Sequence, residues 1–419
     1  MVITAVYLCI DLKSFYASVE CIDRGYDPFK VNLVVADPTR GDGAITLASS
    51  PAIKSLGVKN RCRLFEIPKD IEYEIAMPRM KRYMEVSAQI YSIYLEYISP
   101  DDIHVYSVDE VFIDATPYLK MYGMKPASFA RLLTGAVKRH TGICATVGIG
   151  TNMYLAKVAM DIIAKHTPSH MGYLNEEIYR RQLWHHRPMT DFWNVGHGTA
   201  ARLEKFHAYD MYDVTQLKRE LLFKEFGVKA EFLIDHAWGN EPCTMTDIHS
   251  YIGKNRSLSN SQILFRDYSA EEALLVLKEM SDELSLEMME NQLYAKGITL
   301  FIRYSKNKIR SDGGRKRLDH ATCSRKKIRA AFEELFWEKI TDRTGIRQIG
   351  ISLIDLTYAP ETQISFFDAA DDDSREETAD MSIIDIRHRF GKNSVMKAMD
   401  LCEAATGIER NMMVGGHNG

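Results

Sequence analysis

Two carboxylates stand side by side in the segment HVYSVDEVFIDAT, residues 104–116, where every second residue is apolar or β-branched. This alternation predicts two short strands around a turn, with Asp109 and Glu110 at the turn. Adjacent like charges on a half-buried hairpin repel one another, and burying them unpaired is costly. Something must therefore hold these two carboxylates in place.

A third carboxylate, Asp11, closes an apolar run near the start of the chain. In a ferredoxin-like sheet, the end of that strand and the turn at Asp109 and Glu110 can be neighbours. Three converging carboxylates repel unless divalent cations neutralise them, and their hard oxygen atoms suit Mg²⁺ or Mn²⁺. A pair of such ions supports in-line phosphoryl transfer. The alternative, favoured by a lone Asp-Glu pair, is a solvated turn with Asp11 as a helix N-cap.

The elements that must position these carboxylates follow from the spacing of apolar residues. Apolar runs predict buried strands ending near Asp11 and within 32–38, 41–50 and 143–151. Helical spacing predicts helices within 14–29, 51–61, 79–97, 125–142 and 152–168. The segment to about residue 168 is therefore predicted to be a ferredoxin-like α/β palm, with mostly antiparallel strands and helices on one face. A helical region to about residue 240 follows, and strands and helices alternate again from about 251 to 358.

Charge is unevenly distributed along the chain. The net charge is −4, but residues 251–358 hold 19 Lys/Arg against 15 Asp/Glu, whereas 359–419 hold 6 against 12. A basic module therefore precedes an acidic tail, and DAADDDSREETAD at 368–380 is predicted to be a flexible acidic linker.

The cysteines and the absence of long apolar runs indicate where in the cell the protein works. The seven cysteines form no C-x-x-C pair, which argues against a disulfide framework or a structural zinc site and favours the reducing cytoplasm. No run of about 18 apolar residues occurs, so no membrane partner is expected.

The stretches CID, SFYASVE and YSVDEVFID resemble the motifs of the Y-family, or translesion, DNA polymerases. The resemblance is to the UmuC/DinB-like branch, and especially to the UvrX/UmuC-type proteins of Gram-positive bacteria. It implies an α+β multidomain fold with a ferredoxin-like palm, fingers, a helical helix-hairpin-helix thumb and an α/β little finger. The expected domains are palm 1–20 and 76–168, fingers 21–75, thumb 169–240, little finger 245–358 and a C-terminal tail 359–419.

The resemblance also assigns roles to individual residues. Asp11, Asp109 and Glu110 become the catalytic metal ligands for two Mg²⁺ or Mn²⁺ ions, joined by the Leu12 carbonyl. The implied reaction is attack of a primer 3′-hydroxyl on the α-phosphate of a dNTP, a DNA-directed DNA polymerase activity serving DNA repair, SOS-type damage response and mutagenesis. Tyr16 falls at the steric gate that excludes a 2′-hydroxyl. The lysines expected to bind the triphosphate are Lys54 and Lys165.

Contacts with primer-template DNA are expected in two places. The stretch FWNVGHGTAARL resembles a helix-hairpin-helix, whose N–H groups at Val195, Gly196 and Gly198 would bind a phosphate without reading sequence. In the little finger, the basic and hydroxyl residues expected at the backbone are Lys254, Arg256, Ser257, Ser259, Arg315, Lys316 and Arg317.

The tail contains QISFF at 363–367, which resembles the peptide by which bacterial polymerases bind the β sliding clamp. Gln363 would orient the peptide, while Ile364, Phe366 and Phe367 would fill apolar pockets. The alternative is that both phenylalanines cover the little-finger sheet. The resemblance leaves open a UmuD-like or RecA partner.

Two other functions compete with an active polymerase. One is a nucleotidyl cyclase on a related palm, against which the basic module and the thumb-like hairpin argue. The other is a partner-dependent accessory subunit for damage bypass, against which the presence of all three carboxylates argues.

Overall fold

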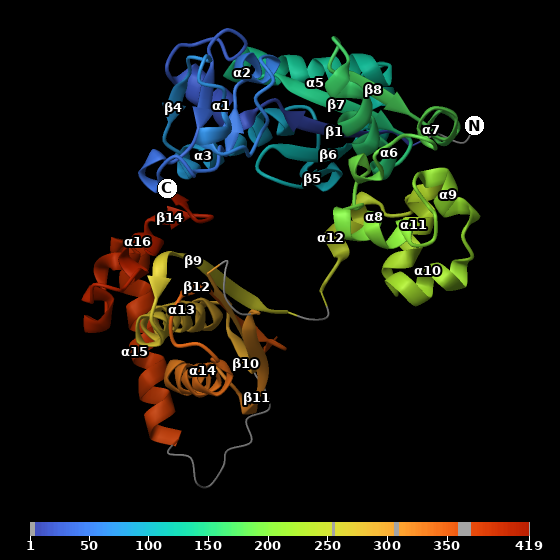
Figure 1. Ribbon diagram of the computed structural model, residues 1–419. Helices are drawn as coiled ribbons and strands as arrows, with labels where there is room; N and C mark the ends of the chain where they lie inside the picture. Colours follow the sequence, from blue (N-terminus) through green and yellow to red (C-terminus); the bar gives the residue numbers. More distant parts are fainter. Residues whose placement is uncertain (1–4, 254–255, 306–309, 359–369, 419) are drawn as a thin grey trace. The chain divides into compact units, whose positions relative to one another are not determined.

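The computed structural model describes residues 5–253, 256–305, 310–358 and 370–418, and side chains within the first five residues of the helix that starts at Ala370 are outside the description. Two compact units divide the chain, one ending at Tyr251 and one running from Ile252 to Asn418 (Figure 1). Each unit has its own apolar core.

A five-stranded sheet organises the first unit. Its order is β5-β6-β1-β7-β8, and all neighbours are antiparallel except β7 and β8. The strands are β1 (Tyr7–Leu12), β5 (Ile103–Val105), β6 (Glu110–Asp114), β7 (Ala145–Gly150) and β8 (Met171–Leu174). The hairpin expected around Asp109 and Glu110 is formed by β5 and β6.

Helices cover both faces of this sheet, which corrects the expectation of helices on one face. The first face packs Leu8, Ile10 and Ile113 against three helices: α1 (Phe15–Asp23), α3 (Met80–Leu95) and α5 (Pro126–Thr141). The second face packs Cys9 and Phe112 against α6 (Met153–Val158) and the π-helical turn Ala159–Ile163 that continues it. The reason is that β1 is apolar at consecutive positions, so both of its faces exclude water.

A small lobe beside α1 is built on the three-stranded sheet β3-β2-β4. Its elements are β2 (Leu33–Val35), β3 (Ala48–Ser49), α2 (Pro51–Ser55) and β4 (Glu74–Ala76). Ser50 caps α2 by accepting from the Ile53 N–H, and Pro51 occupies the first helical turn, where no N–H is needed.

Helices make up the remainder of the first unit. They are α4 (Thr116–Met121) beside the sheet, and then α7 (Glu176–Leu183), α8 (His197–Glu204), α9 (Met211–Gln216), α10 (Arg219–Phe226), α11 (Lys229–Trp238) and α12 (Met245–Ser250). The structure differs here from the expected start of the little finger at residue 245. Met245 of α12 packs with Cys9 and Phe112, so this helix belongs to the first unit.

A four-stranded antiparallel sheet with helices on one face forms the centre of the second unit. Its order is β11-β10-β12-β9, with the short β13 pairing with β10. The elements are β9 (Leu258–Tyr268), α13 (Ala270–Glu290), β10 (Leu293–Tyr304), β11 (Asp312–Thr322), α14 (Arg325–Lys339), β12 (Ile346–Ile354) and β13 (Thr357–Tyr358). Apolar residues alternate along β10 and β12 because only one face is covered by helices.

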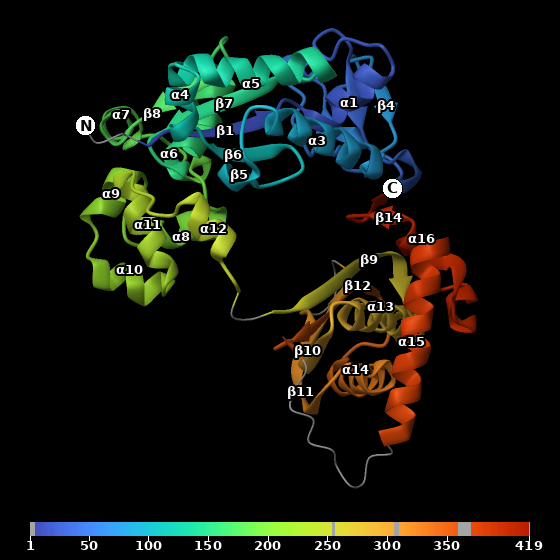
Figure 2. The ribbon, with the colours of Figure 1, turned by 180° about the vertical axis from the view of Figure 1, so that it is seen from behind.

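The C-terminal residues fold onto α13, as both views of the chain show (Figure 2). They form α15 (Ala370–Phe390), α16 (Gly407–Asn411), β14 (Met413–Val414) and β15 (His417–Asn418). The expected flexible acidic linker is therefore wrong for 370–380, which lies in α15. The physical reason is pairing of charge: buried Asp380 contacts Arg325 at 2.5 Å, and Glu283 of α13 contacts Arg387 and Lys392.

Within the described residues, no helix combines the length and the apolar character that crossing a lipid bilayer requires.

Candidate active site

Pairing of β1 with β6 brings the three carboxylates to one end of the sheet. Asp11 is the direct antiparallel partner of Glu110, so their side chains share the face covered by α6. The N–H of Leu12 donates to the Asp109 carbonyl at 2.8 Å, which ties the residue after Asp11 to the residue before Glu110. The residues that the sequence predicts to be neighbours are neighbours.

Burial and mutual repulsion raise the pKa of Asp11. Its pKa is raised to about 6, first by burial and also by the nearby Asp109 and Glu110 carboxylates, while Lys165 opposes the rise. Such a carboxylate gains from any added positive charge.

Lysines provide part of that charge. Lys157 Nζ lies 2.7 Å from Glu110 Oε2, and both side chains are buried. Lys165 Nζ lies 3.9 Å from Asp11 Oδ2. Burial alone would lower the pKa of Lys165, but the Asp11 and Asp161 carboxylates raise it above its ordinary value. The helix that follows β7 thus supplies positive charge beside the hairpin.

As they stand, no three His, Cys, Asp or Glu side chains among the described residues are gathered into a ready-made metal site. Glu110 instead accepts from Lys157 and from the Cys9 thiol, and Asp109 Oδ1 accepts from Ser107 Oγ at 2.7 Å. The donor set still fits a hard divalent cation, because all three side chains are carboxylates, and burial together with the Asp109 and Glu110 charges raises the pKa of Asp11.

Tyr16 lies in the first turn of α1, two residues after the N-cap Ser14, whose backbone is left-handed (φ 52°). Its ring stacks on Tyr83 with centroids 4.4 Å apart and planes 14° apart. Burial and the nearby Asp109 carboxylate raise the pKa of Tyr16, which places the ring beside the acidic cluster. Tyr83 donates in turn to Glu20 Oε1 at 2.8 Å.

Lys54 reaches the same region from α2. Its Nζ donates to Ser14 Oγ at 2.7 Å, and Ser14 precedes α1. Burial lowers the pKa of Lys54; Asp11 opposes this shift, whereas Lys165 and Lys13 add to it. Lys54 of α2, Lys157 of α6 and Lys165 shortly after the π-helical turn therefore all interact electrostatically with Asp11.

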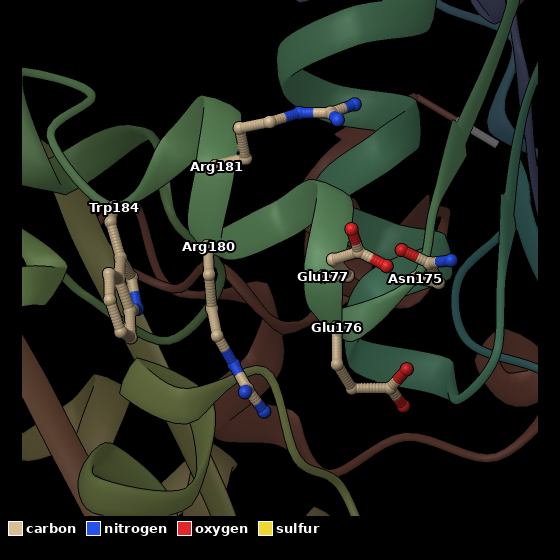
Figure 3. A pocket seen from close by; sticks show the side chains of 6 residues that line it. All are labelled: Asn175, Glu176, Glu177, Arg180, Arg181 and Trp184. Carbon is tan, nitrogen blue, oxygen red and sulfur yellow. The ribbon is translucent and has the colours of Figure 1, made fainter.

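A polar hollow of about 590 Å³ lies elsewhere, along α7 (Figure 3). Its lining residues come from one helix, its N-cap and its C-cap: Asn175, Glu176, Glu177, Arg180, Arg181 and Trp184. None of the residues predicted to bind metal, nucleotide or DNA lines it.

Comparison with known proteins adds the family. The impB/mucB/samB family model matches residues 10–161, and the model of that family's C-terminal domain matches residues 255–366. UvrX of Bacillus subtilis, named as a UV-damage repair protein, is 31% identical over 414 residues, which cover 98% of this chain and 97% of UvrX. The chain belongs to the impB/mucB/samB family, the Y-family of DNA polymerases. The predicted family is thereby confirmed.

Other relatives agree with this membership. DNA polymerase IV 2 of Bacillus subtilis is 28% identical over 416 residues and covers 98% of each chain. A solved Y-family DNA polymerase chimera superposes with a TM-score of 0.64 at 21% identity, covering 84% of this chain and all of that one. The predicted fold class and the predicted translesion DNA polymerase activity are confirmed. Y-family enzymes generally depend on divalent metal and act on primer-template DNA and dNTPs.

The predicted helix-hairpin-helix surrounds the start of α8. Gly196 is the N-cap and Gly198 lies in the first turn, and a side chain added at either would meet open space. Val195 differs from the expectation: its side chain is buried and its N–H already donates to the Phe192 carbonyl at 3.1 Å. Val195 therefore supports the hairpin, and Gly196 and Gly198 remain its candidate donors to a phosphate.

The helix-free face of the second sheet presents three of the other predicted DNA contacts, which are Ser259, Arg315 and Arg317. Ser259 donates to Ser352 at 2.9 Å beside a shallow hollow of about 400 Å³. Arg315 lies opposite Thr299 of the same hollow and pairs with Asp355, and Arg317 shares its face two residues on. Arg256 packs over the Tyr358 ring, and Ser257 is exposed.

Lys316 is a correction. It alternates with Arg315 and Arg317 along β11 and therefore points to the opposite face, where it contacts Glu334 of α14 at 2.5 Å. Lys254 and the clamp-binding residues Gln363, Ile364, Phe366 and Phe367 lie outside the described residues.

Sequence reasoning missed the partners of the predicted residues. The sequence alone does not indicate that Lys157 contacts Glu110. Asp161 was not singled out at all. The regular spacing of Lys157, Asp161 and Lys165, each four residues from the next, was the available signal, because such residues share one face of a helix.

Proposed function

We propose that Asp11, Asp109 and Glu110, with the Leu12 carbonyl, hold two Mg²⁺ ions, which Mn²⁺ replaces, in the polymerase active site. The convergence of Asp11 at the end of β1 with Asp109 and Glu110 at the start of β6 is the observation that carries this proposal. When bound, such ions supply charge neutralisation and lower the barrier to attack on the α-phosphate. The catalysis then rests largely on positioning, as in phosphoryl transfer generally.

The chain's own residues divide the remaining tasks. Tyr16, held flat by its stack on Tyr83, excludes a ribose 2′-hydroxyl. Lys54 and Lys165 neutralise the triphosphate of the incoming dNTP from two sides. Both oxygens of Glu110 are engaged, Oε2 by Lys157 and Oε1 by the Cys9 thiol, so Glu110 has to give up one of these contacts to bind a metal.

DNA is held through its backbone in this proposal. Gly196 and Gly198 bind a phosphate at the start of α8, and Arg256, Ser257, Ser259, Arg315 and Arg317 contact phosphates from the second unit. Palm, fingers, thumb and little finger would occupy the ranges predicted from the sequence, with α12 joining the first unit and α15 to β15 joining the second. The relatives' names, a UV-damage repair protein and DNA polymerase IV 2, support DNA synthesis in repair, and we place this work in the cytoplasm.

Segment 363–367 is the proposed ligand of the β sliding clamp, and a UmuD-like or RecA partner remains a further proposal. The clamp proposal rests on the peptide QISFF alone.

Primer extension with single-residue variants tests the metal assignment. Asp109→Ala is expected to lower kcat at least about a thousandfold. Without this ligand, the ions that neutralise the negative charge developing at the α-phosphate are no longer held in place. Asp114→Ala, at the far end of β6, the strand that begins right after Asp109, is the matched control and should retain activity. Full activity of Asp109→Ala with Mg²⁺ present would refute the assignment, and product from a single NTP without template would favour the cyclase.

A further inference from the structure

Asp161 joins the two lysines of the active site and has no role in the assignments above. Its Oδ1 lies 2.7 Å from Lys165 Nζ, and its Oδ2 lies 3.1 Å from Lys157 Nζ. Lys157 continues to Glu110 at 2.7 Å, and Lys165 continues to Asp11 at 3.9 Å. Five side chains of alternating charge thus run from one carboxylate of the acidic cluster to another, with Asp161 at the centre.

The backbone around Asp161 is held in place by the sheet on which it packs. Asp161 lies in the π-helical turn Ala159–Ile163, which rests on β7 and β8. A Cβ added at Gly148 would lie 2.0 Å from the Ala156 carbonyl oxygen, and one added at Gly172 would lie 2.4 Å from that of Ala159. Helix and sheet therefore approach as closely as glycine allows, and the position of the Asp161 backbone is set by this contact.

The two lysines that Asp161 contacts differ in their exposure to solvent. The side chain of Lys157 is 10% exposed, whereas that of Lys165 is 40% exposed and ends at the open side of the cluster. A lysine ammonium on a four-carbon stem has many orientations when it is free. Anchoring one side of Lys165 removes much of that freedom before a ligand arrives, which lowers the entropic cost of binding.

Ordinary ion pairing four residues apart on a helix is the competing explanation. Such pairs contribute little when they are exposed and affect stability alone. Asp161 differs because its carboxylate serves two ammonium groups at once, and one of them already holds Glu110.

We propose that Asp161 is a positioning residue for the incoming nucleotide: its carboxylate holds Lys165 in the orientation that meets the triphosphate. The inference rests on the proposed role of Lys165 in binding that triphosphate. Asp161 touches no substrate in this arrangement and acts through the lysine. Its loss therefore weakens nucleotide binding more than it slows the chemical step.

The test measures nucleotide binding with chemistry blocked. The full chain is bound to a primer-template whose primer ends in a 2′,3′-dideoxynucleotide, and the Kd of the next correct dNTP is measured at equilibrium. We compare Asp161→Asn, Lys165→Gln, the double variant and the control Asp37→Asn, which removes an aspartate paired with Arg40 in the small lobe. Thermal unfolding without divalent ions is recorded for each.

We expect Asp161→Asn to raise the Kd about fivefold, a typical size for one lost charged contact. Lys165→Gln should raise it further, and the double variant should match Lys165→Gln, because Asp161 acts only through that lysine. In single-nucleotide insertion, KM should rise more than kcat falls. Asp161→Glu, which keeps the charge, should recover most of the binding, and Asp37→Asn should behave like the unaltered chain.

Two results would overturn the inference while leaving the polymerase assignment intact. One is an unchanged Kd for Asp161→Asn when Lys165→Gln raises it, and the other is multiplication of the two effects in the double variant. An unchanged Kd for Lys165→Gln removes the phosphate-binding role of Lys165 and this inference with it. If Asp161→Asn unfolds below the assay temperature, Asp161→Ser, which leaves room for water beside Lys157, carries the same comparison.

Discussion

At the scale of single residues, the ring of Tyr16 is held by a neighbour that sequence spacing did not identify. Tyr83 stacks on it and is itself fixed by Glu20. We predict that Tyr16→Ala raises the ratio of ribonucleotide to deoxyribonucleotide incorporation about tenfold or more, since a 2′-hydroxyl then finds space. Single-nucleotide insertion with matched rNTP and dNTP measures the ratio. Tyr122→Ala, at a partly buried tyrosine remote from the cluster, is the control, and an unchanged ratio in Tyr16→Ala refutes the gate.

Much of the candidate site could be predicted from the identity of its residues. Asp11, Asp109 and Glu110 were predicted to converge, and the pairing of Asp11 with Glu110 brings them together. What sequence could not give is the rotamer of each side chain, which depends on partners far away in the chain. Lys157, for example, lies 47 residues from Glu110.

At the scale of elements, the close contact between the π-helical turn and the sheet makes a sharp prediction. Gly148→Ala forces an atom to within 2.0 Å of the Ala156 carbonyl oxygen, so the helix must move away from β7. We expect a loss of about 3 kcal/mol in the free energy of unfolding and a fall in nucleotide affinity. Urea unfolding checks the first effect. Gly135→Ala, on the solvent side of α5, is the control, and a fully stable Gly148→Ala would contradict the packing described here.

Alternation along β11 makes a second prediction. Arg315→Ala should weaken DNA binding and reduce the slope of log K against log salt by about 1, because one phosphate contact is lost. Lys316→Ala, which removes a side chain directed at α14, is the matched control and should leave the slope unchanged. Fluorescence anisotropy at several salt concentrations measures both. Equal effects of the two variants would show that the face is assigned wrongly.

The strands and helices of the palm were predictable because their apolar pattern is strong, and the β5–β6 hairpin lies where the alternation placed it. Two predictions failed because they treated polar sequence as unstructured or one face as exposed. The acidic run at 370–380 is helical because Asp380 is matched by Arg325, and α6 covers the second face of the sheet. Both outcomes depend on partners distant in sequence.

At the scale of the whole chain, the clamp proposal concerns how synthesis is sustained on long templates. Deleting 363–367 should abolish stimulation by the β sliding clamp and spare extension of short primers, since the residues proposed for catalysis are untouched. Extension on a long primed template, with and without the clamp, measures this. Replacing the same five residues by a Gly-Ser stretch is the control for chain length. Undiminished stimulation after deletion would exclude this peptide as the clamp ligand.

The docking of the C-terminal residues on α13 bears on how this polymerase can be shortened. Buried Glu279 accepts from the N–H groups of Thr406 and Gly407 at 3.0 Å each, and Glu283 contacts Arg387 at 3.1 Å. A fragment ending at residue 366, where the family match stops, would expose apolar surface on α13 and strip both carboxylates of these partners. Such a fragment would place unpaired carboxylates beside an exposed apolar helix surface, so we expect residues 370–418 to be needed for the stability of the second unit.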